Sequence, residues 1–223
     1  MFMDFLQAIA ERHSVRQYLD KPIEGETLAA LKQAVADCNA ESGLHIQLVV
    51  NEPKAFDSFI AHYGKFSGAA NYIALIGKKA PGMEEACGYW GEKLVLLAQT
   101  LGLNTCWAGG SYQKVPSAYT VGPGEKLSLV IAVGYGATQG HPRKSKTYEQ
   151  VTKAGDGAPE WFKKGVEAAL LAPTAINQQK FTFTLQGDKV LAKAGLGFFA
   201  KTDLGIVKCH FEIGAGKGRD VWA

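Results

Sequence analysis

The sequence lacks any apolar run that approaches the roughly 20 residues of a membrane-spanning helix. Its first stretch, MFMDFLQAIAERHS, carries acidic residues early and predicts an amphipathic helix rather than an export signal. The four cysteines (Cys38, Cys87, Cys106 and Cys209) have no C-x-x-C spacing, so we expect free thiols in a reducing cytosol. These absences predict a cytoplasmic protein with no membrane partner.

An excess of charge of one sign is also missing. The net charge of +3 is too small and too scattered to predict nucleic-acid binding. The five histidines form no H-x-x-x-H pair and have no carboxylate at a metal-ligand spacing. There is no G-x-S-x-G, no P-loop motif and no G-x-G-x-x-G after the first predicted strand. The sequence therefore disfavours a metalloenzyme, a serine hydrolase of that type, a P-loop NTPase and a Rossmann dehydrogenase.

What is present suits a folded chain with a sizeable core. The 223 residues are 47% apolar and 20% charged, which fits one large domain or two small ones. Apolar periodicity predicts a series of helices and strands in the first two thirds of the chain. The expected helices cover about 2–11, 24–39, 56–64 and 84–101, and the expected strands cover 45–51, 71–79, 104–108 and 127–136. A basic, polar loop is expected over 137–152.

The segment AGDGAPE at 154–160 is the best linker candidate, because it is rich in glycine and proline. After it the pattern starts again, with a helix at 159–174, two strands within 180–195 and a helix at 202–216. Residues 31–49 align without gaps over 167–185, and the glycine-led helices that begin at Gly91 and Gly205 also match. We therefore expect a complete α+β unit over 1–153 and a truncated second copy over 159–223; the alternative is an accidental similarity.

Two basic segments are candidate phosphate ligands. In RHSVR, an extended backbone would point Arg12, Ser14 and Arg16 to one side, where the guanidinium groups give bidentate contacts to phosphate. The segment HPRKSK at 141–146 could complete such a pocket. For each segment, the alternative is a solvated basic loop.

Two further segments offer backbone and amide groups. In WAGGS at 107–111, Gly109 and Gly110 would let backbone N–H groups approach a ligand closely, or would simply form a tight turn. PTAINQQ at 173–179 carries amides suited to a heteroaromatic edge or a sugar chain, or to capping the end of a helix. Cys106 is expected to be a neutral buried thiol rather than a nucleophile.

The order of four segments resembles the nitroreductase superfamily. These segments are RHSVRQYLDKPI, GYWGEKLVLLAQTLGLNTCWAGGS, LSLVIAVGYG and HPRKSK. The resemblance covers most of residues 1–150. It implies an α+β fold that binds FMN and passes electrons from NADH or NADPH to nitroaromatics, quinones or similar small acceptors.

One departure from the family pattern is informative. The family has a P-S-x-x-N-x-Q-P-W elbow shortly after its second helix, where this chain has DCNAESGLH; a similar elbow, PTAINQQKF, stands at 173–181 instead. The chain in this respect resembles the TM-type nitroreductases, in which one chain forms a pseudo-dimer. That resemblance implies a central mixed or antiparallel sheet flanked by helices, an internal pseudo-two-fold repeat, one FMN site within the chain, and a protein that can act as a monomer.

The resemblance also assigns site residues. Lys65 would reach the polar edge of the flavin ring, and no protein residue is expected to act as a catalytic acid or base. The donor would deliver hydride to flavin N5 and leave before the acceptor binds, in a ping-pong sequence. The FMN ligands so implied are Arg12, His13, Ser14, Arg16, Lys65, Ala108, Gly109, Gly110, Arg143, Lys144, Pro173, Thr174, Ala175, Asn177 and Gln179. The alternatives are a non-catalytic or degenerate flavin-binding module, and a flavin enzyme of another outcome such as a dehalogenase or a dehydrogenase.

Overall fold

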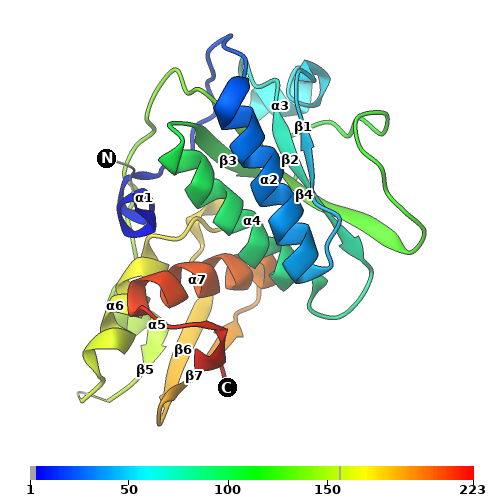
Figure 1. Cartoon of the computed structure of the whole chain (residues 1–223). Coiled ribbons are helices and arrows are strands. Elements are labelled where there is room, and N and C mark those ends of the chain that lie inside the picture. Colours follow the sequence, from blue (N-terminus) through cyan, green and yellow to red (C-terminus); the bar gives the residue numbers. More distant parts are fainter. Residues whose placement is uncertain (1–3, 156) are drawn as a thin grey trace.

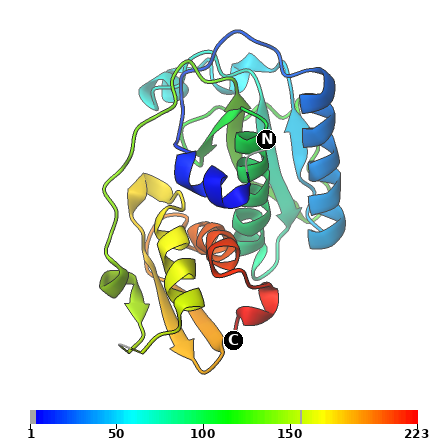
Figure 2. The ribbon, with the colours of Figure 1, turned by 60° about the vertical axis from the view of Figure 1, so that its left-hand side comes forward.

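The computed structural model describes residues 4–155 and 157–223 (Figure 1). Residues 2 and 3 of the helix expected at 2–11, and residue 156 of the expected linker, therefore lie outside the described residues. The described chain forms an α+β fold, as predicted, but its strands lie in two sheets rather than in the single central sheet expected. The helices α4 and α7 lie between the two sheets (Figures 1 and 2).

The first sheet has four antiparallel strands in the order β1-β2-β4-β3. Both of its faces are buried, because Ile73 and Leu75 of β2 belong to one core cluster while Tyr72 and Ile76 belong to another. Burial on both faces explains why the central strands are nearly continuous apolar runs. The strands are β1 (Gln47–Val49), β2 (Tyr72–Lys78), β3 (Asn104–Ala108) and β4 (Glu125–Gly134).

Helices cover both faces of this sheet. On one face, α1, α2 and α4 supply apolar residues at helical spacing, such as Leu31 and Val35 of α2. On the other face, the short α3 and the 3₁₀ turn η1 cover Tyr72 and Ala74. The bounds of these elements are α1 (Phe5–Glu11), α2 (Gly25–Ser42), α3 (Phe59–Tyr63), α4 (Met83–Thr100) and η1 (Pro53–Ala55).

The second sheet has three strands in the order β5-β6-β7, with β5 parallel and β7 antiparallel to β6. Helices α6 and α7 pack on this sheet. The core between them contains Phe162 of α6, Phe183 of β6 and Phe211 of α7. The elements are α5 (Tyr148–Val151), β5 (Thr152–Lys153), α6 (Glu160–Leu170), η2 (Ala175–Asn177), β6 (Phe181–Gln186), β7 (Lys189–Ala194), α7 (Ala200–Ala215) and η3 (Arg219–Val221).

Two expectations need correction in this part. The loop expected over 137–152 contains α5, which begins at a capping box formed by Thr147 and Gln150. The helix expected over 159–174 ends at Leu170, three residues before Pro173, whose ring cannot continue a helix. The chain from 137 to 147 runs down the outside of the molecule, from the part that contains the first sheet to the part that contains the second (Figure 2).

Helix α4 packs on α7 between the two sheets, and the contact is reciprocal. A Cβ atom on Gly88 of α4 would overlap the backbone of Thr202 in α7, and one on Gly205 of α7 would overlap the backbone of Glu85 in α4. Gly88 and Gly205 therefore occupy equivalent places in this helix contact. The internal repeat itself stays a prediction.

Within residues 4–155 and 157–223, no helix has the length and apolarity needed to cross a membrane. In the same residues, no group of three or more His, Cys, Asp or Glu side chains is arranged to hold a metal ion.

Candidate functional site

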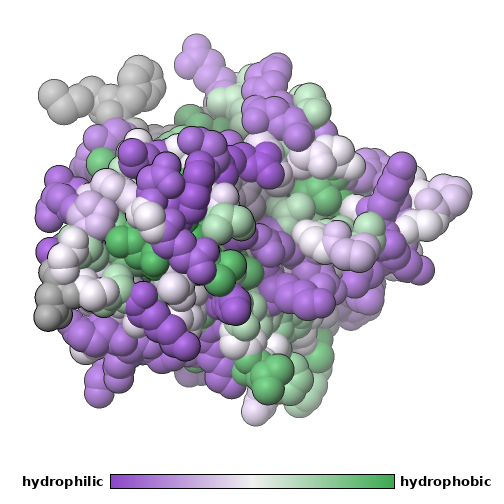
Figure 3. Space-filling view, turned by 90° about the horizontal axis from the view of Figure 1, so that it is seen from below, coloured by the Kyte–Doolittle hydropathy of each residue, from purple (hydrophilic) through white to green (hydrophobic). Residues whose placement is uncertain are grey.

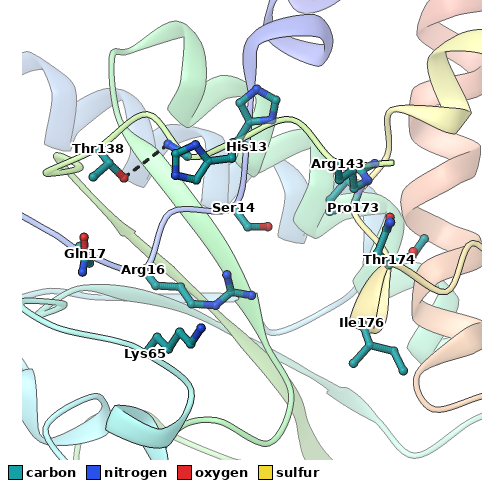
Figure 4. Close-up of a pocket in the computed structure, with 13 residues that line it drawn as sticks. His13, Ser14, Arg16, Gln17, Lys65, Thr138, Arg143, Pro173, Thr174 and Ile176 are labelled. Atoms are coloured by element: carbon teal, nitrogen blue, oxygen red, sulfur yellow. Dashed lines mark hydrogen bonds between the residues drawn. The ribbon is translucent and has the colours of Figure 1, made fainter. Parts of the chain in front are cut away.

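A cleft with two adjoining lobes lies between the first sheet and the 173–177 elbow (Figure 4). The basic lobe has a volume of about 500 Å³, and the apolar lobe has a volume of about 300 Å³. Ser14 and Arg16 on one side, and Pro173, Thr174 and Ile176 on the other, line both lobes. The shared walls make the two lobes one elongated cleft, wide enough for a ligand of cofactor size.

The segment after α1 is fixed along the first sheet by single bridges. Ser14 pairs with Thr105 of β3 and Gln17 pairs with Ser67, so the backbone is extended between them. This conformation directs Arg16 into the cleft, where Lys65 points the same way, toward Thr174 (Figure 4). The extended backbone predicted for RHSVR is therefore present.

Arg12 does not line either lobe, although the sequence pattern placed it beside Ser14 and Arg16. Its side chain is only 3% exposed, and its Nε and Nη1 have no hydrogen-bond partner among the described residues. The Nε of Arg143 is likewise buried without a partner in that part of the chain. Burial lowers the pKa of both guanidinium groups, and the charge of Arg12 lowers the pKa of Arg143 further. Two neighbouring like charges, each with a buried N–H donor that has no partner in this part of the chain, favour an anion in the adjacent lobe.

The basic lobe carries further positive charge and polar groups. Burial lowers the pKa of His13, and the charges of Arg12, Arg143 and His141 lower it further. Lys65 has a φ of 65°, a left-handed conformation that an L side chain adopts only under constraint. The lobe can therefore bind an anionic ligand through guanidinium and ammonium groups and a polyol through Ser14 and Thr174.

The apolar lobe begins where β3 ends. Trp107, Ala108, Gly109 and Gly110 line it, and a Cβ on Gly110 would have open space around it within 4 Å. A Cβ on Gly109 would overlap the ring of Phe199, which covers that glycine. The bare backbone beside an aromatic ring provides a flat wall for a planar ligand.

The elbow forms the opposite wall under backbone strain. Ile176, Asn177 and Gln179 have φ values of 47°, 55° and 43°, all in the left-handed region. This conformation is rare for a β-branched residue such as isoleucine. The Nδ2 of Asn177 donates to the carbonyl oxygen of Lys144 at 2.8 Å, which connects the elbow to the 141–146 segment. Strained residues of this kind cluster at binding sites.

Asp203, in the first turn of α7, supports the elbow from beneath. Its carboxylate accepts hydrogen bonds from the backbone N–H of Ala175 at 3.1 Å and from Gln178 Nε2 at 2.7 Å. Burial raises the pKa of Asp203 to about 6, and these two hydrogen bonds oppose that rise. Asp203 also lines the apolar lobe, so it is a titratable group in the wall of the cleft.

A buried polar network lies behind Trp107. The indole Nε1 donates to Glu92 Oε2 at 2.9 Å, and Glu92 Oε1 lies 2.8 Å from His210 Nε2. His210 Nδ1 lies 3.1 Å from the carbonyl oxygen of Ala168, which can only accept a hydrogen bond, so Nδ1 donates to it. Both side chains are fully buried. The network joins α4, α6 and α7 to the wall of the apolar lobe.

Most residues predicted for the site line the cleft. They are His13, Ser14, Arg16, Lys65, Ala108, Gly109, Gly110, Arg143, Pro173, Thr174, Ala175 and Asn177. Arg12, Lys144 and Gln179 do not line it. Gln179 is 2% exposed, and its amide bonds to Lys146 N, Ser145 and the carbonyl oxygen of Leu170. It therefore holds the 141–146 segment against the end of α6.

Sequence reasoning missed Trp107, Phe199 and Asp203 as residues of the cleft. Phe199 and Asp203 had a usable signal, because FF follows a glycine-rich turn and an acid stands in the otherwise apolar stretch TDLGIV. Trp107 had none, since an aromatic residue at the end of a strand is usually part of a core.

Comparison with known proteins gives the family. Residues 4–215 match the family model described as "Putative TM nitroreductase". The chain therefore belongs to this nitroreductase family. A comparison with curated protein sequences found no significant match.

Solved structures share the fold. One described as a putative nitroreductase from Thermotoga maritima is 22% identical, has a TM-score of 0.69, and the match covers 96% of this chain and 84% of that one. Two described as putative NADH dehydrogenase/NAD(P)H nitroreductases, from Bacteroides thetaiotaomicron and Parabacteroides distasonis, are also 22% identical, with TM-scores of 0.53 and 0.52. Each of those two matches covers 66% of this chain and 95% of the other.

Proposed function

We propose that this member of the TM nitroreductase family is an FMN-dependent oxidoreductase that uses NADH or NADPH to reduce nitroaromatics, quinones or similar small acceptors. The observation that carries the proposal is the positive charge of the basic lobe, which Arg16, Lys65 and Arg143 line, with Arg12 buried behind it. A phosphate dianion in this lobe would supply acceptors and the opposite charge.

The rest of the cleft fits the remaining parts of FMN. Ser14, Thr174 and Asn177 line the space next to the arginines and offer partners for the ribityl hydroxyls. The glycine wall at 109–110 and the elbow face each other across the apolar lobe, which suits a flat ring system. Lys65 and the backbone N–H groups of the glycine wall would stabilise negative charge on the polar edge of that ring.

When bound, FMN would accept hydride from the nicotinamide and pass the electrons to the acceptor. The protein's own contribution is position and electrostatics. Arg16 and Arg143 would anchor the phosphate end, with the buried charge of Arg12 behind them, and the strained elbow would hold one face of the ring. Trp107 is fixed by Glu92, so the wall behind the ring is rigid before the ligand arrives.

We also propose that residues 159–223 complete the site as the second half of a pseudo-dimer. The support is the reciprocal contact of Gly88 with the backbone of Thr202, and of Gly205 with the backbone of Glu85. An isologous two-fold interface has this property, because each half uses the same surface. On this proposal the arginines of one half and the elbow of the other hold one cofactor, so that the chain can act as a monomer.

The first experiment is the absorption spectrum of the purified protein, with and without added FMN, followed by addition of NADPH or NADH. We expect the protein to bind flavin, and the visible absorbance of that flavin to disappear when NADPH or NADH is added. A protein that stays colourless with an excess of FMN would overturn the proposal. In addition, Arg16→Ala should weaken FMN binding by about 1.5–3 kcal/mol, the contribution of a charged hydrogen bond.

Steady-state turnover separates an enzyme from a flavin-binding module. With nitrofurazone or menadione as acceptor, an enzyme oxidises NAD(P)H continuously, whereas a binding module gives at most one turnover of the bound flavin. A flavoprotein that bleaches but does not turn over with any acceptor would favour the non-catalytic alternative.

A further inference from the structure

The loop between β7 and α7, residues 195–199 (GLGFF), exposes large apolar side chains to water. Leu196 is 93% exposed and Phe198 is 83% exposed. Ile176, on the neighbouring elbow, is 90% exposed. Gln178 Nε2 donates to the carbonyl oxygen of Phe198 at 2.7 Å, so the loop and the elbow are held together. The apolar side chains therefore form one group on a fixed backbone.

Positive charge surrounds this group. Between Asp188 and Asp203 the sequence has no acidic residue, and Lys193 and Lys201 are exposed on the two sides of the loop. The side chain of Lys180, also exposed, passes close to Gly195 and Gly197. The nearby acids do not cancel these charges, because Asp203 is buried and Glu84 is paired with Lys126 at 2.9 Å.

Exposed apolar residues are common when they stand singly, but this loop combines several of them with lysines. The face of the molecule in Figure 3 is mostly hydrophilic, and hydrophobic residues there are confined to a few patches. An apolar loop flanked by three exposed lysines has the chemistry of a surface that enters the interface of an anionic bilayer. The apolar side chains enter the acyl boundary while the ammonium groups contact the lipid headgroups.

We propose that the 195–199 loop binds the protein reversibly to anionic lipid surfaces. Contact is peripheral and differs from membrane spanning, for which the described residues have no suitable helix. Phe199, at the end of the loop, lines the apolar lobe, so the docked lipid surface adjoins the cleft. The inference does not depend on the cofactor.

The test uses the purified full chain and sedimentation with vesicles. One set of vesicles is phosphatidylcholine alone, and the other contains about one third phosphatidylglycerol. We expect binding to the anionic vesicles that weakens as salt is added, and much weaker binding to the neutral ones. No binding to the anionic vesicles at low salt would overturn the proposal.

Two double variants locate the surface. Lys193→Gln/Lys201→Gln should lower partitioning onto anionic vesicles by about 25-fold, because each lysine near an anionic surface contributes about fivefold. Leu196→Ser/Phe198→Ser should lower it by about tenfold or more. All four side chains are exposed, so both variants should keep the circular dichroism spectrum of the parent.

Matched controls change the same residue types elsewhere. Lys32→Gln/Lys164→Gln removes exposed lysines from α2 and α6, and Leu6→Ser/Leu19→Ser removes exposed leucines near α1. Neither control should change partitioning more than twofold, and an equal loss in the controls and the loop variants would contradict the proposal. A second outcome would also contradict the proposal. If the parent is a dimer, and Leu196→Ser/Phe198→Ser converts it to a monomer without changing vesicle binding, the loop binds a second copy of the chain and not a lipid surface.

Discussion

Gly88 of α4 and Gly205 of α7 each lie against the backbone of the other helix, at the same distance from the first residue of their own helix. The partners, Thr202 and Glu85, precede the two glycines by about one helical turn. Each glycine thus allows the other helix to approach to backbone contact. The close packing of α4 on α7 therefore requires glycine at both positions.

Alanine at either position should destabilise the fold. A Cβ at Gly88 or Gly205 would overlap backbone atoms, which cannot rotate away, so we expect a loss of about 1–3 kcal/mol in the free energy of unfolding. This loss exceeds the gain of roughly 1 kcal/mol that alanine brings to a helix. Urea unfolding measures it. The control is Gly155→Ala, which has open space around its Cβ, and equal midpoints for all three variants would contradict the packing argument.

Arg12→Met should weaken binding of FMN but not of riboflavin, which lacks the phosphate. We expect about a 10–150-fold loss for FMN, the equivalent of one charged hydrogen bond. Fluorescence titration with both flavins measures the difference. Lys32→Met, on the exposed face of α2, is the control, and an equal loss for FMN and riboflavin would remove Arg12 from the phosphate site.

Asp203 should make stability depend on pH. Its pKa is about 6 in the folded protein and about 3.8 in the unfolded chain, so the folded state binds more protons between these values. Stability contributed by the protonated carboxyl is therefore fully present below pH 3.8 and is lost as the pH rises through about 6. Urea unfolding at a series of pH values across this range should show that the unfolding free energy of the parent falls as the pH rises. This fall should be absent in Asp203→Asn. If the unfolding free energies of the two proteins change equally with pH, the pKa of Asp203 is not raised in the folded protein.

The buried pair Glu92 and His210 should behave as one unit. Glu92→Leu leaves His210 and the indole of Trp107 without their acceptor, and we expect a cost of about 3–5 kcal/mol. His210→Leu should also destabilise the protein, since it leaves Glu92 buried with fewer partners. The double variant should cost less than the sum of the two single ones, which a double-mutant cycle by urea unfolding measures. Additive effects would show that the two side chains are independent.

The sequence predicted elements best where one face of a helix, or both faces of a strand, are buried. The helix expected at 84–101 is α4 (Met83–Thr100), and the strand expected at 71–79 is β2 (Tyr72–Lys78). Prediction failed for short elements. The four-residue α5 has too few apolar residues to show a period, and only its capping box marks it.

The ends of elements were also decided by tertiary structure. The helical pattern continues past Leu170 in the sequence, but the carbonyl oxygens of Leu170 and Ala172 accept hydrogen bonds from Arg143, and Gln179 also donates to Leu170. These donors come from a distant segment and from the elbow. A local pattern carries no information about them.

The sequence by itself determined the α+β class, the order of the elements and the segments with the chemistry of a binding site, because these depend on local periodicity and residue type. Only the tertiary structure decided which of those residues meet. It brought Arg16 and Asn177 to one cleft, buried Arg12 beside Arg143, and turned Gln179 away from the cleft toward Leu170. The physical reason is that charge pairing, burial and backbone contact such as that of Gly88 with Thr202 depend on distances in space, which separation along the chain does not specify.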